Sequence, residues 1–149
     1  MKAPRMCVVI ESRLDCVALA GHLARTFCEH AGASPLESGQ IELCVVEAMN
    51  NCIFHAYKLR AGQSVRLCVS KSGLNLVFEI CDWGRAMHPK KLRDGREHVL
   101  NIDETEAKDL RENGRGLAIM QSLMDTVRYS SLRGSNRLKL TKTLVRTGA

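Results

Sequence analysis

The stretch "VVEAMNNCIFHAY", residues 45–57, combines an apolar helical pattern with a carboxylate and two adjacent amides. At about 100° per residue, four polar side chains fall on one side of the predicted helix, and most of the remaining circumference is apolar. These four residues are Glu47, Asn50, Asn51 and His55. Buried carboxylates and amides are costly unless a partner satisfies them. The stretch therefore predicts a polar stripe that faces a protein partner, water, or a ligand with a cation.

Length and composition favour a single globular domain over residues 1–149. The 149 residues are 45% hydrophobic, which is enough for a folded core. No segment approaches the roughly 20 apolar residues of a membrane-spanning helix. The apolar run at the N-terminus is too short for a signal peptide. We therefore expect a cytoplasmic protein that does not associate with membranes.

The chain has seven cysteines, an odd number, with no CxxC pair. Most of them fall in apolar runs, as Cys7, Cys44, Cys68 and Cys81 do. This pattern favours small buried side chains in a reducing compartment over a metal site or a set of disulfides.

A net charge of +6 raises the possibility of nucleic-acid binding. However, Lys and Arg are spread along the chain, and aromatic residues make up only 4% of it. We therefore expect no direct nucleic-acid binding. A basic surface for an acidic protein partner fits the same charge equally well.

The periodicity along the chain predicts an α+β fold. Expected strands lie at 6–10, 64–70, 74–82, 126–132 and 137–145, and expected helices at 14–32, 39–57 and 116–125. The first helix repeats Leu19, Leu23 and Phe27 at helical spacing, and Ser38 is the predicted N-cap of the second. Residues 83–113 show little periodicity. This order predicts a two-layer sandwich, with a mostly antiparallel sheet and three helices on one face.

Two further segments carry residues that could bind a ligand. In "CDWGRAMHP", residues 81–89, Asp82 ends a strand and Gly84 permits a tight turn. In "ENGRGLAIM", residues 112–120, Gly114 and Gly116 come just before the predicted third helix. Such a loop can offer backbone N–H groups and the helix dipole to phosphates. Each segment on its own is better explained as an ordinary glycine turn.

Taken together, the three segments resemble the GHKL, or Bergerat-fold, ATPase superfamily. Residues 47–55 resemble its N box, 82–89 its first glycine box and 114–117 its second, so residues from about 90 to 113 correspond to the ATP lid. The size of the chain, the N-box helix and the C-terminal hairpin resemble the stand-alone serine kinases that act as anti-sigma factors in bacterial partner switching.

The resemblance implies a role for each polar residue of the opening stretch. Asn51 would bind Mg²⁺, which joins the triphosphate of ATP, and Glu47 would be the general base. Asp82 would accept a hydrogen bond from the adenine amino group, and Gly84 would let the base approach the backbone. The other residues expected to bind the nucleotide are Asn50, Gly114, Arg115, Gly116 and Leu117. For His55 we expect a structural role.

One departure from the family pattern is Ala86, since the first glycine box often carries a glycine at this position. Alanine tolerates fewer backbone conformations than glycine does, so the sequence alone does not determine the geometry of this loop.

The resemblance also implies partners: a small antagonist protein of the STAS type as substrate, a sigma factor or equivalent target, and a second copy of the chain in a homodimer. The main alternative is a nucleotide-binding module with little or no kinase activity. The ATP-binding domain of a sensor histidine kinase is a weaker alternative, because no phosphoacceptor helix hairpin precedes the domain. A nucleic-acid-binding protein would leave the three boxes unexplained.

Overall fold

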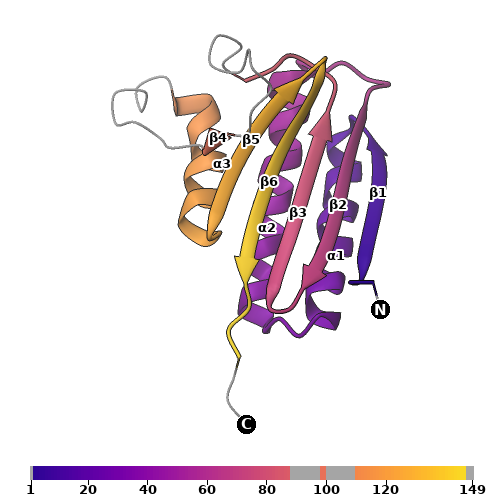
Figure 1. Ribbon diagram of the computed structural model, residues 1–149. Coiled ribbons are helices and arrows are strands. Elements are labelled where there is room, and N and C mark those ends of the chain that lie inside the picture. Colours follow the sequence, from indigo (N-terminus) through magenta and orange to yellow (C-terminus); the bar gives the residue numbers. More distant parts are fainter. Residues whose placement is uncertain (1, 88–97, 100–109, 147–149) are drawn as a thin grey trace.

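The computed structural model describes residues 2–87, 98–99 and 110–146, and within them it contains one antiparallel sheet with helices on a single face (Figure 1). The sheet has six strands in the order β1-β2-β3-β6-β5-β4, and all five neighbouring pairs are antiparallel. The strands are β1 (Arg5–Glu11), β2 (Ser64–Ser72), β3 (Asn75–Asp82), β4 (His98–Val99), β5 (Thr126–Leu132) and β6 (Ser135–Thr143). The helices are α1 (Leu14–His30), α2 (Pro35–Asn51), the short η1 (Cys52–Ala56) and α3 (Leu110–Leu123). The predicted two-layer α+β sandwich is confirmed.

The core lies between the sheet and the helix layer. Alternate residues of each strand point to the helix side, and in β3 these are the fully buried Leu76, Phe78 and Ile80. From the helix layer, α2 contributes Ile41 and Val45, both with no exposed surface. The other face of the sheet carries mostly polar residues and no helix covers it (Figure 1). One face of the sheet is therefore available to solvent over the described residues.

Helix α1 packs through small residues, not through the leucines that the spacing suggested. Leu19 is 60% exposed and Leu23 is 37% exposed, so the predicted apolar face is wrong for these two. The buried side is made by small residues such as Ala20, Gly21 and Ala24. A Cβ on Gly21 would lie 2.7 Å from Cγ2 of Val46, which shows how closely α1 approaches α2.

Helix α2 begins earlier than predicted. Ser34, not Ser38, is its N-cap: the Ser34 hydroxyl accepts from the Glu37 N–H, and the Glu37 carboxylate accepts from the Ser34 N–H. Pro35 stands at the first helical position, where its missing N–H costs nothing. Ser38 is buried inside the first turns, and its hydroxyl donates to the Ser34 carbonyl. The sequence "GASPLES" is thus a capping box and not a linker.

The sequence predicted a regular α-helix up to residue 57, but the C-terminal end of this helix is not a regular α-helix. Residues Cys52–Ala56 form the π-helical turn η1, and the N–H of Tyr57 donates to the Cys52 carbonyl at 2.9 Å. Single π-helical turns inside helices occur frequently at functional sites. This one follows Asn51 directly, in the middle of the polar stripe.

The second half of the chain holds two differences from the prediction. Strand β4 pairs with β5 at the edge of the sheet, although 83–113 had been predicted to lack regular structure. Helix α3 begins at Leu110, so Gly114 and Gly116 lie inside it and not in a loop before it. The β5–β6 hairpin is tighter than predicted, because Arg133 and Gly134 both have positive φ, as a two-residue type I′ turn requires. The remainder of the predicted ATP lid lies outside the described residues.

Two cysteines differ from the expectation of free thiols. Cys7 and Cys68 are directly opposite on β1 and β2 and form a disulfide, with their Cα atoms 4.1 Å apart. The expectation failed here because only the strand register brings these residues together. It holds for Cys28 and Cys44, which are free and buried, and burial raises their thiol pKa to about 12 and about 11.

Within the described part of the chain, no helix has the length and apolar character needed to cross a bilayer.

Candidate functional site

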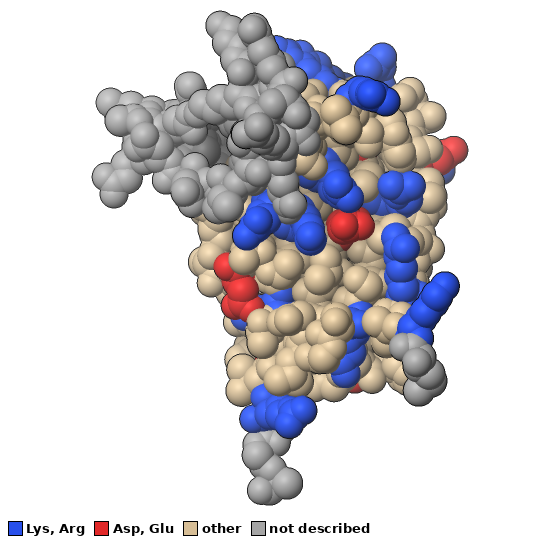
Figure 2. Space-filling view, viewed as in Figure 1, with Lys and Arg blue, Asp and Glu red and all other residues tan. Residues whose placement is uncertain are grey.

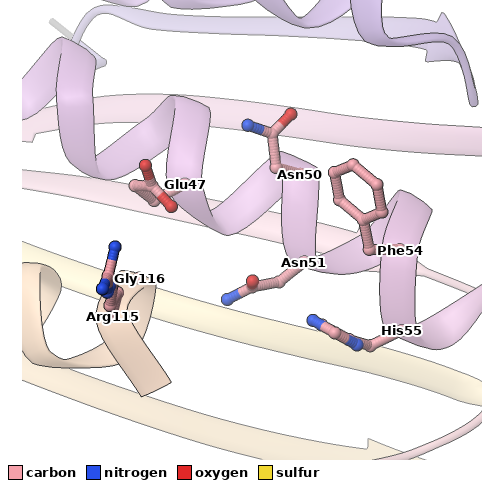
Figure 3. Close-up of a pocket in the computed structure, with 7 residues that line it drawn as sticks. All are labelled: Glu47, Asn50, Asn51, Phe54, His55, Arg115 and Gly116. Atoms are coloured by element: carbon pink, nitrogen blue, oxygen red, sulfur yellow. The ribbon is translucent and has the colours of Figure 1, made fainter. Parts of the chain in front are cut away.

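A pocket of about 540 Å³ opens between the end of α2 and the beginning of α3 (Figure 3). Seven residues line it: Glu47, Asn50, Asn51, Phe54, His55, Arg115 and Gly116. The first five come from α2 and η1, and the last two come from α3. The whole predicted polar stripe of residues 45–57 therefore faces this pocket, together with part of the predicted second glycine box.

Gly116 brings the two helices together. A Cβ at this position would lie 3.0 Å from Oε2 of Glu47 and 3.4 Å from Nδ2 of Asn51. Gly116 is buried, and Figure 3 shows it facing the side of α2 that carries these two residues. The missing side chain is thus what allows α3 to lie against the carboxylate and the amide. These are hard oxygen donors of the kind that a divalent cation such as Mg²⁺ prefers.

Phe54 is a pocket residue that the sequence reasoning missed. It is 43% exposed and lines the pocket beside Asn50 and His55. The signal was available, because Phe54 stands seven residues after Glu47, or two helical turns on the same side. An aromatic ring at the mouth of a polar pocket adds an apolar wall to it.

A second cluster surrounds Asp82 at the end of β3. Asp82 is 6% exposed, and its Oδ1 accepts from the Gly84 N–H at 3.0 Å and from Nδ2 of Asn136 at 2.7 Å. Asn136 also donates to the Gly84 carbonyl and accepts from the Ser131 hydroxyl. Burial raises the pKa of the Asp82 carboxyl, and the hydrogen bonds from Asn136 and Gly84 act in the opposite direction. The carboxylate is therefore held in one orientation by neutral donors.

The backbone after Asp82 is held at three points. The Trp83 N–H donates to the Tyr57 hydroxyl at 2.8 Å, and the Met87 N–H donates to the Tyr129 hydroxyl at 2.9 Å. Between them, the Arg85 N–H donates to the Ala56 carbonyl at 2.8 Å. Burial raises the pKa of the Tyr129 hydroxyl to about 12, so it stays protonated at neutral pH. The segment is thus fixed against η1 and β5.

The structure gives Gly84 a packing role beside the one that was predicted. A Cβ on Gly84 would lie 2.4 Å from the Ala56 carbonyl oxygen, so only glycine allows the turn to pack on the end of η1. The structure also shows whether Ala86 needs a backbone conformation that favours glycine. Among the described non-glycine residues, positive φ occurs only at Lys58, Leu59 and Arg133, so Ala86 needs no glycine-like conformation.

The predicted site residues therefore fall into two groups that η1 joins, since His55 lines the pocket and Ala56 contacts the Asp82 turn. Leu117 packs against the core and is not one of the lining residues. Gly114 lies two residues before Gly116 in α3. Residues 88 and 89 of the first glycine box lie outside the described residues.

Asn136 was missed for a different reason from Phe54. Nothing in its local sequence marks it, because it follows a hairpin turn in a polar stretch. Its importance comes from the register, which places it directly opposite Asp82 on β6. Tyr57 and Tyr129, whose hydroxyls accept hydrogen bonds from backbone N–H groups, were missed for the same reason.

Comparison with known proteins identifies the family of the chain. The sequence profile of the histidine kinase-like ATPase domain matches residues 10–142, which includes both groups of site residues. The chain belongs to the histidine kinase-like ATPase domain family. This confirms the superfamily that the three boxes suggested, and an ATPase domain implies ATP binding.

Several relatives of this ATPase-family chain are anti-sigma F factors. That of Clostridium acetobutylicum is 28% identical over 98 residues, which cover 66% of this chain and 64% of the relative. That of Clostridium beijerinckii is 24% identical over 135 residues, covering 91% of this chain and 90% of the relative. That of Thermoanaerobacter pseudethanolicus is 29% identical over 107 residues, covering 71% and 70%. The first of these matches thus spans less than two thirds of the relative's length.

Solved structures share the fold of this ATPase domain at low identity. The RsbU and RsbW domains of a Mycobacterium tuberculosis protein match with a TM-score of 0.65 and 16% identity, over 96% of this chain and 32% of the other. The SiaB–SiaC complex from Pseudomonas aeruginosa matches with a TM-score of 0.68 and 17% identity, over 91% of this chain and 88% of the other. These likenesses support the architecture in Figure 1.

Proposed function

We propose that this protein is an ATP-dependent serine-protein kinase that acts as an anti-sigma factor in a bacterial partner-switching system. The observation that carries the proposal is the juxtaposition of Glu47 and Asn51 in one pocket, directly against Gly116 of α3. A carboxylate, an amide oxygen and a nearby cationic side chain, Arg115, are the groups that phosphoryl transfer from ATP requires.

The adenine is assigned to the Asp82 cluster. Because Gly84 and Asn136 both donate to Oδ1, the carboxylate has acceptor capacity left for the adenine amino group. The triphosphate is assigned to the pocket, with contacts from Asn50, Gly114, Arg115 and Gly116. Leu117, which packs against the core, would position this part of α3. The side chain of Arg115 would place positive charge beside the phosphates.

Asn51 is the residue that would hold Mg²⁺. Its amide lines the pocket beside a carboxylate, and Mg²⁺ commonly takes one or two protein oxygens and fills its other positions with water and phosphate. When bound, the ion neutralises charge on the phosphates.

Glu47 is assigned the role of general base. Its Oε2 lies at the pocket wall formed by Gly116, where it could accept the proton of a substrate hydroxyl as that oxygen attacks the terminal phosphate. The remaining contribution of the protein is positioning, which α2 and α3 supply as rigid elements.

The relatives support a proposal for the partners. Because several of them are anti-sigma F factors, we propose a small STAS-type antagonist as the protein substrate and a sigma factor or equivalent target as the sequestered protein. A homodimer is part of the proposal, and the unpaired edge of β1 with the exposed Leu19 and Leu23 of α1 offers a surface for it. We place the protein in the cytoplasm, as one ATPase domain over residues 1–149.

The first test is thermal unfolding with and without Mg-ATP. A ligand that binds only the native state at 100 times its Kd adds roughly 2.7 kcal/mol to the free energy of unfolding. The second test is capture of partners from a cell extract with and without ATP, followed by mapping of phosphorylated serines on the captured antagonist. A melting curve that millimolar Mg-ATP leaves unchanged would remove the nucleotide site. Binding of ATP without phosphate transfer would favour the alternative of a regulatory nucleotide-binding module.

A further inference from the structure

The uncovered face of the sheet gathers positive charge over its central strands (Figure 2). On β6 and β5, three of the outward positions are occupied by Arg137, Lys139 and Arg128, between inward residues that are buried. Arg66 on β2 points to the same side of the sheet. It is directly opposite Cys81 on β3, and Cys81 is directly opposite Arg137 on β6. We call Arg66, Arg128, Arg137, Lys139 and the adjacent Trp83 the basic face.

The charges of the basic face are not balanced within the described residues. Glu79 is the one acidic residue at an outward position of β2, β3, β5 or β6, and its Oε1 lies 3.5 Å from Nη1 of Arg137. Lys139 lies between two neighbouring strands, directly opposite Glu79 on β3 and directly opposite Arg128 on β5. Neither Arg128 nor Lys139 makes an ion pair with any described residue. Like charges in directly opposite positions destabilise a sheet. Within the described residues, the basic face therefore carries four cations and one carboxylate.

The shape of the face suits a partner that approaches the sheet closely. Two small outward side chains, Cys81 and Ser130, alternate with the arginines in the row that runs from Arg66 through Arg137. Because neighbouring strands are about 4.8 Å apart, Arg66 and Arg137 start from backbones roughly 10 Å apart. Trp83 is 47% exposed at the end of this row, and the guanidinium of Arg66 lies 5.6 Å from the centre of its ring.

We propose that the basic face docks an acidic segment of a protein partner, on the opposite layer from the nucleotide pocket. Arginine binds carboxylates through two parallel hydrogen bonds, and three of the four cations here are arginines. Proteins that bind single-stranded nucleic acid stack successive bases on several aromatic rings. This face has one exposed aromatic ring, which Arg66 already covers on one side, so carboxylates fit it better than a nucleic acid. The proposal does not depend on whether ATP binds.

The test is fluorescence anisotropy of a fluorescein-labelled oligoglutamate peptide, with an oligothymidylate of equal charge as the competing probe. The key variant is Arg128→Glu, which turns the like-charge pair with Lys139 into an opposite-charge pair. We expect this variant to melt at the same or a higher temperature while it binds oligoglutamate at least about fivefold more weakly. The matched control is Arg5→Glu, which makes the same charge change on the same side of the sheet but at the β1 edge, opposite Ser70. We expect this control to change the affinity for oligoglutamate by less than about twofold.

A second variant, Lys139→Gln, removes one charge without adding another and should also weaken the binding of oligoglutamate. The proposal is overturned if oligothymidylate binds more tightly than oligoglutamate, which would assign a nucleic acid to this face. It is also overturned if Arg5→Glu weakens binding as much as Arg128→Glu does, or if the parent protein does not bind the peptide at about 0.15 M salt.

Discussion

The two ends of the candidate site differ in how deeply their side chains are buried and in how they are hydrogen-bonded. At the Asp82 end, the carboxylate is 6% exposed and Asn136 is 1% exposed, and each makes hydrogen bonds to neutral partners. At the Glu47 end, the side chains line an open pocket between two helices. These buried hydrogen bonds fix the carboxylate in one orientation, which suits recognition of a flat base. Phosphates, a metal ion and a protein substrate instead need space and water, which an open pocket provides.

The largest effect is expected at the open end. Glu47→Ala should lower the rate of phosphate transfer by roughly 10²–10⁴-fold, because a lost general base acts mainly in the transition state. ATP binding should stay near the parental value or become slightly tighter, since a negative charge near the triphosphate is removed. The measurement pairs nucleotide titration with radiolabel transfer to the purified antagonist.

Asn51→Ala is the companion variant, and it should weaken Mg-ATP binding and abolish transfer together. The assignment of roles fails if Glu47→Ala transfers phosphate at the parental rate. It fails equally if both variants unfold, because the polar stripe would then serve the fold.

The next effect concerns stability at the buried end. Asn136→Leu removes two donors, so the Asp82 carboxylate and the Gly84 carbonyl stay buried with fewer partners. We expect a loss of about 3 kcal/mol in the free energy of unfolding, or roughly 6–12 °C in Tm. Urea unfolding measures it. The matched control is Asn50→Leu, the same substitution at the open end, which should change stability by less than about 0.5 kcal/mol. An equal loss in the free energy of unfolding in the two variants would show that the buried end and the open end contribute equally to stability.

A third prediction uses the pKa of Asp82. Since burial raises it above the ordinary 3.8, the stability that this group contributes is full below pH 3.8 and is lost as the pH rises through the folded-state pKa. Asp82→Asn removes that loss, so the variant should gain stability relative to the parent as the pH rises from 4 toward 7. It should also bind ATP roughly ten- to a hundredfold more weakly, because an N–H₂ group replaces an acceptor for the adenine amino group.

Urea unfolding at several pH values and an ATP titration test both halves of this prediction. A stability difference between Asp82→Asn and the parent that does not change with pH would contradict the first half. Unchanged ATP affinity would take the adenine away from Asp82.

The smallest effect is expected at the contact between the helices. Gly116→Ala gains helix propensity but places a Cβ 3.0 Å from the Glu47 carboxylate, so the two contributions should nearly cancel in stability. ATP binding should weaken by about threefold, because the pocket wall must shift. Gly39→Ala in α2 is the control, since a Cβ there meets no atom within 4 Å. It should gain about 0.5–1 kcal/mol without affecting ATP. An equal gain in Gly116→Ala would mean that the contact is not tight.

Local pattern was enough to locate most elements of the fold. Strand periodicity found β2 and β3, and the polar stripe found the pocket residues of α2, because both signals repeat within a few residues. The failures have particular causes. Leu19 and Leu23 were expected in the core, but α1 approaches α2 through glycine and alanine. Helix α3 extends across two glycines that would ordinarily interrupt it, since its packing against α2 outweighs propensity.

What the sequence by itself determined is most of the helices and strands, their order and most of the side chains that face the pocket, since these depend on periodicity over one or two turns. The tertiary structure decided which distant residues meet. Asn136 reaches Asp82 across a strand pair, Gly84 packs on Ala56, Cys7 meets Cys68, and Arg128 faces Lys139. Each of these contacts depends on strand register or on the close approach of two backbones. A shift of one residue in register would turn every one of those strand side chains to the other face.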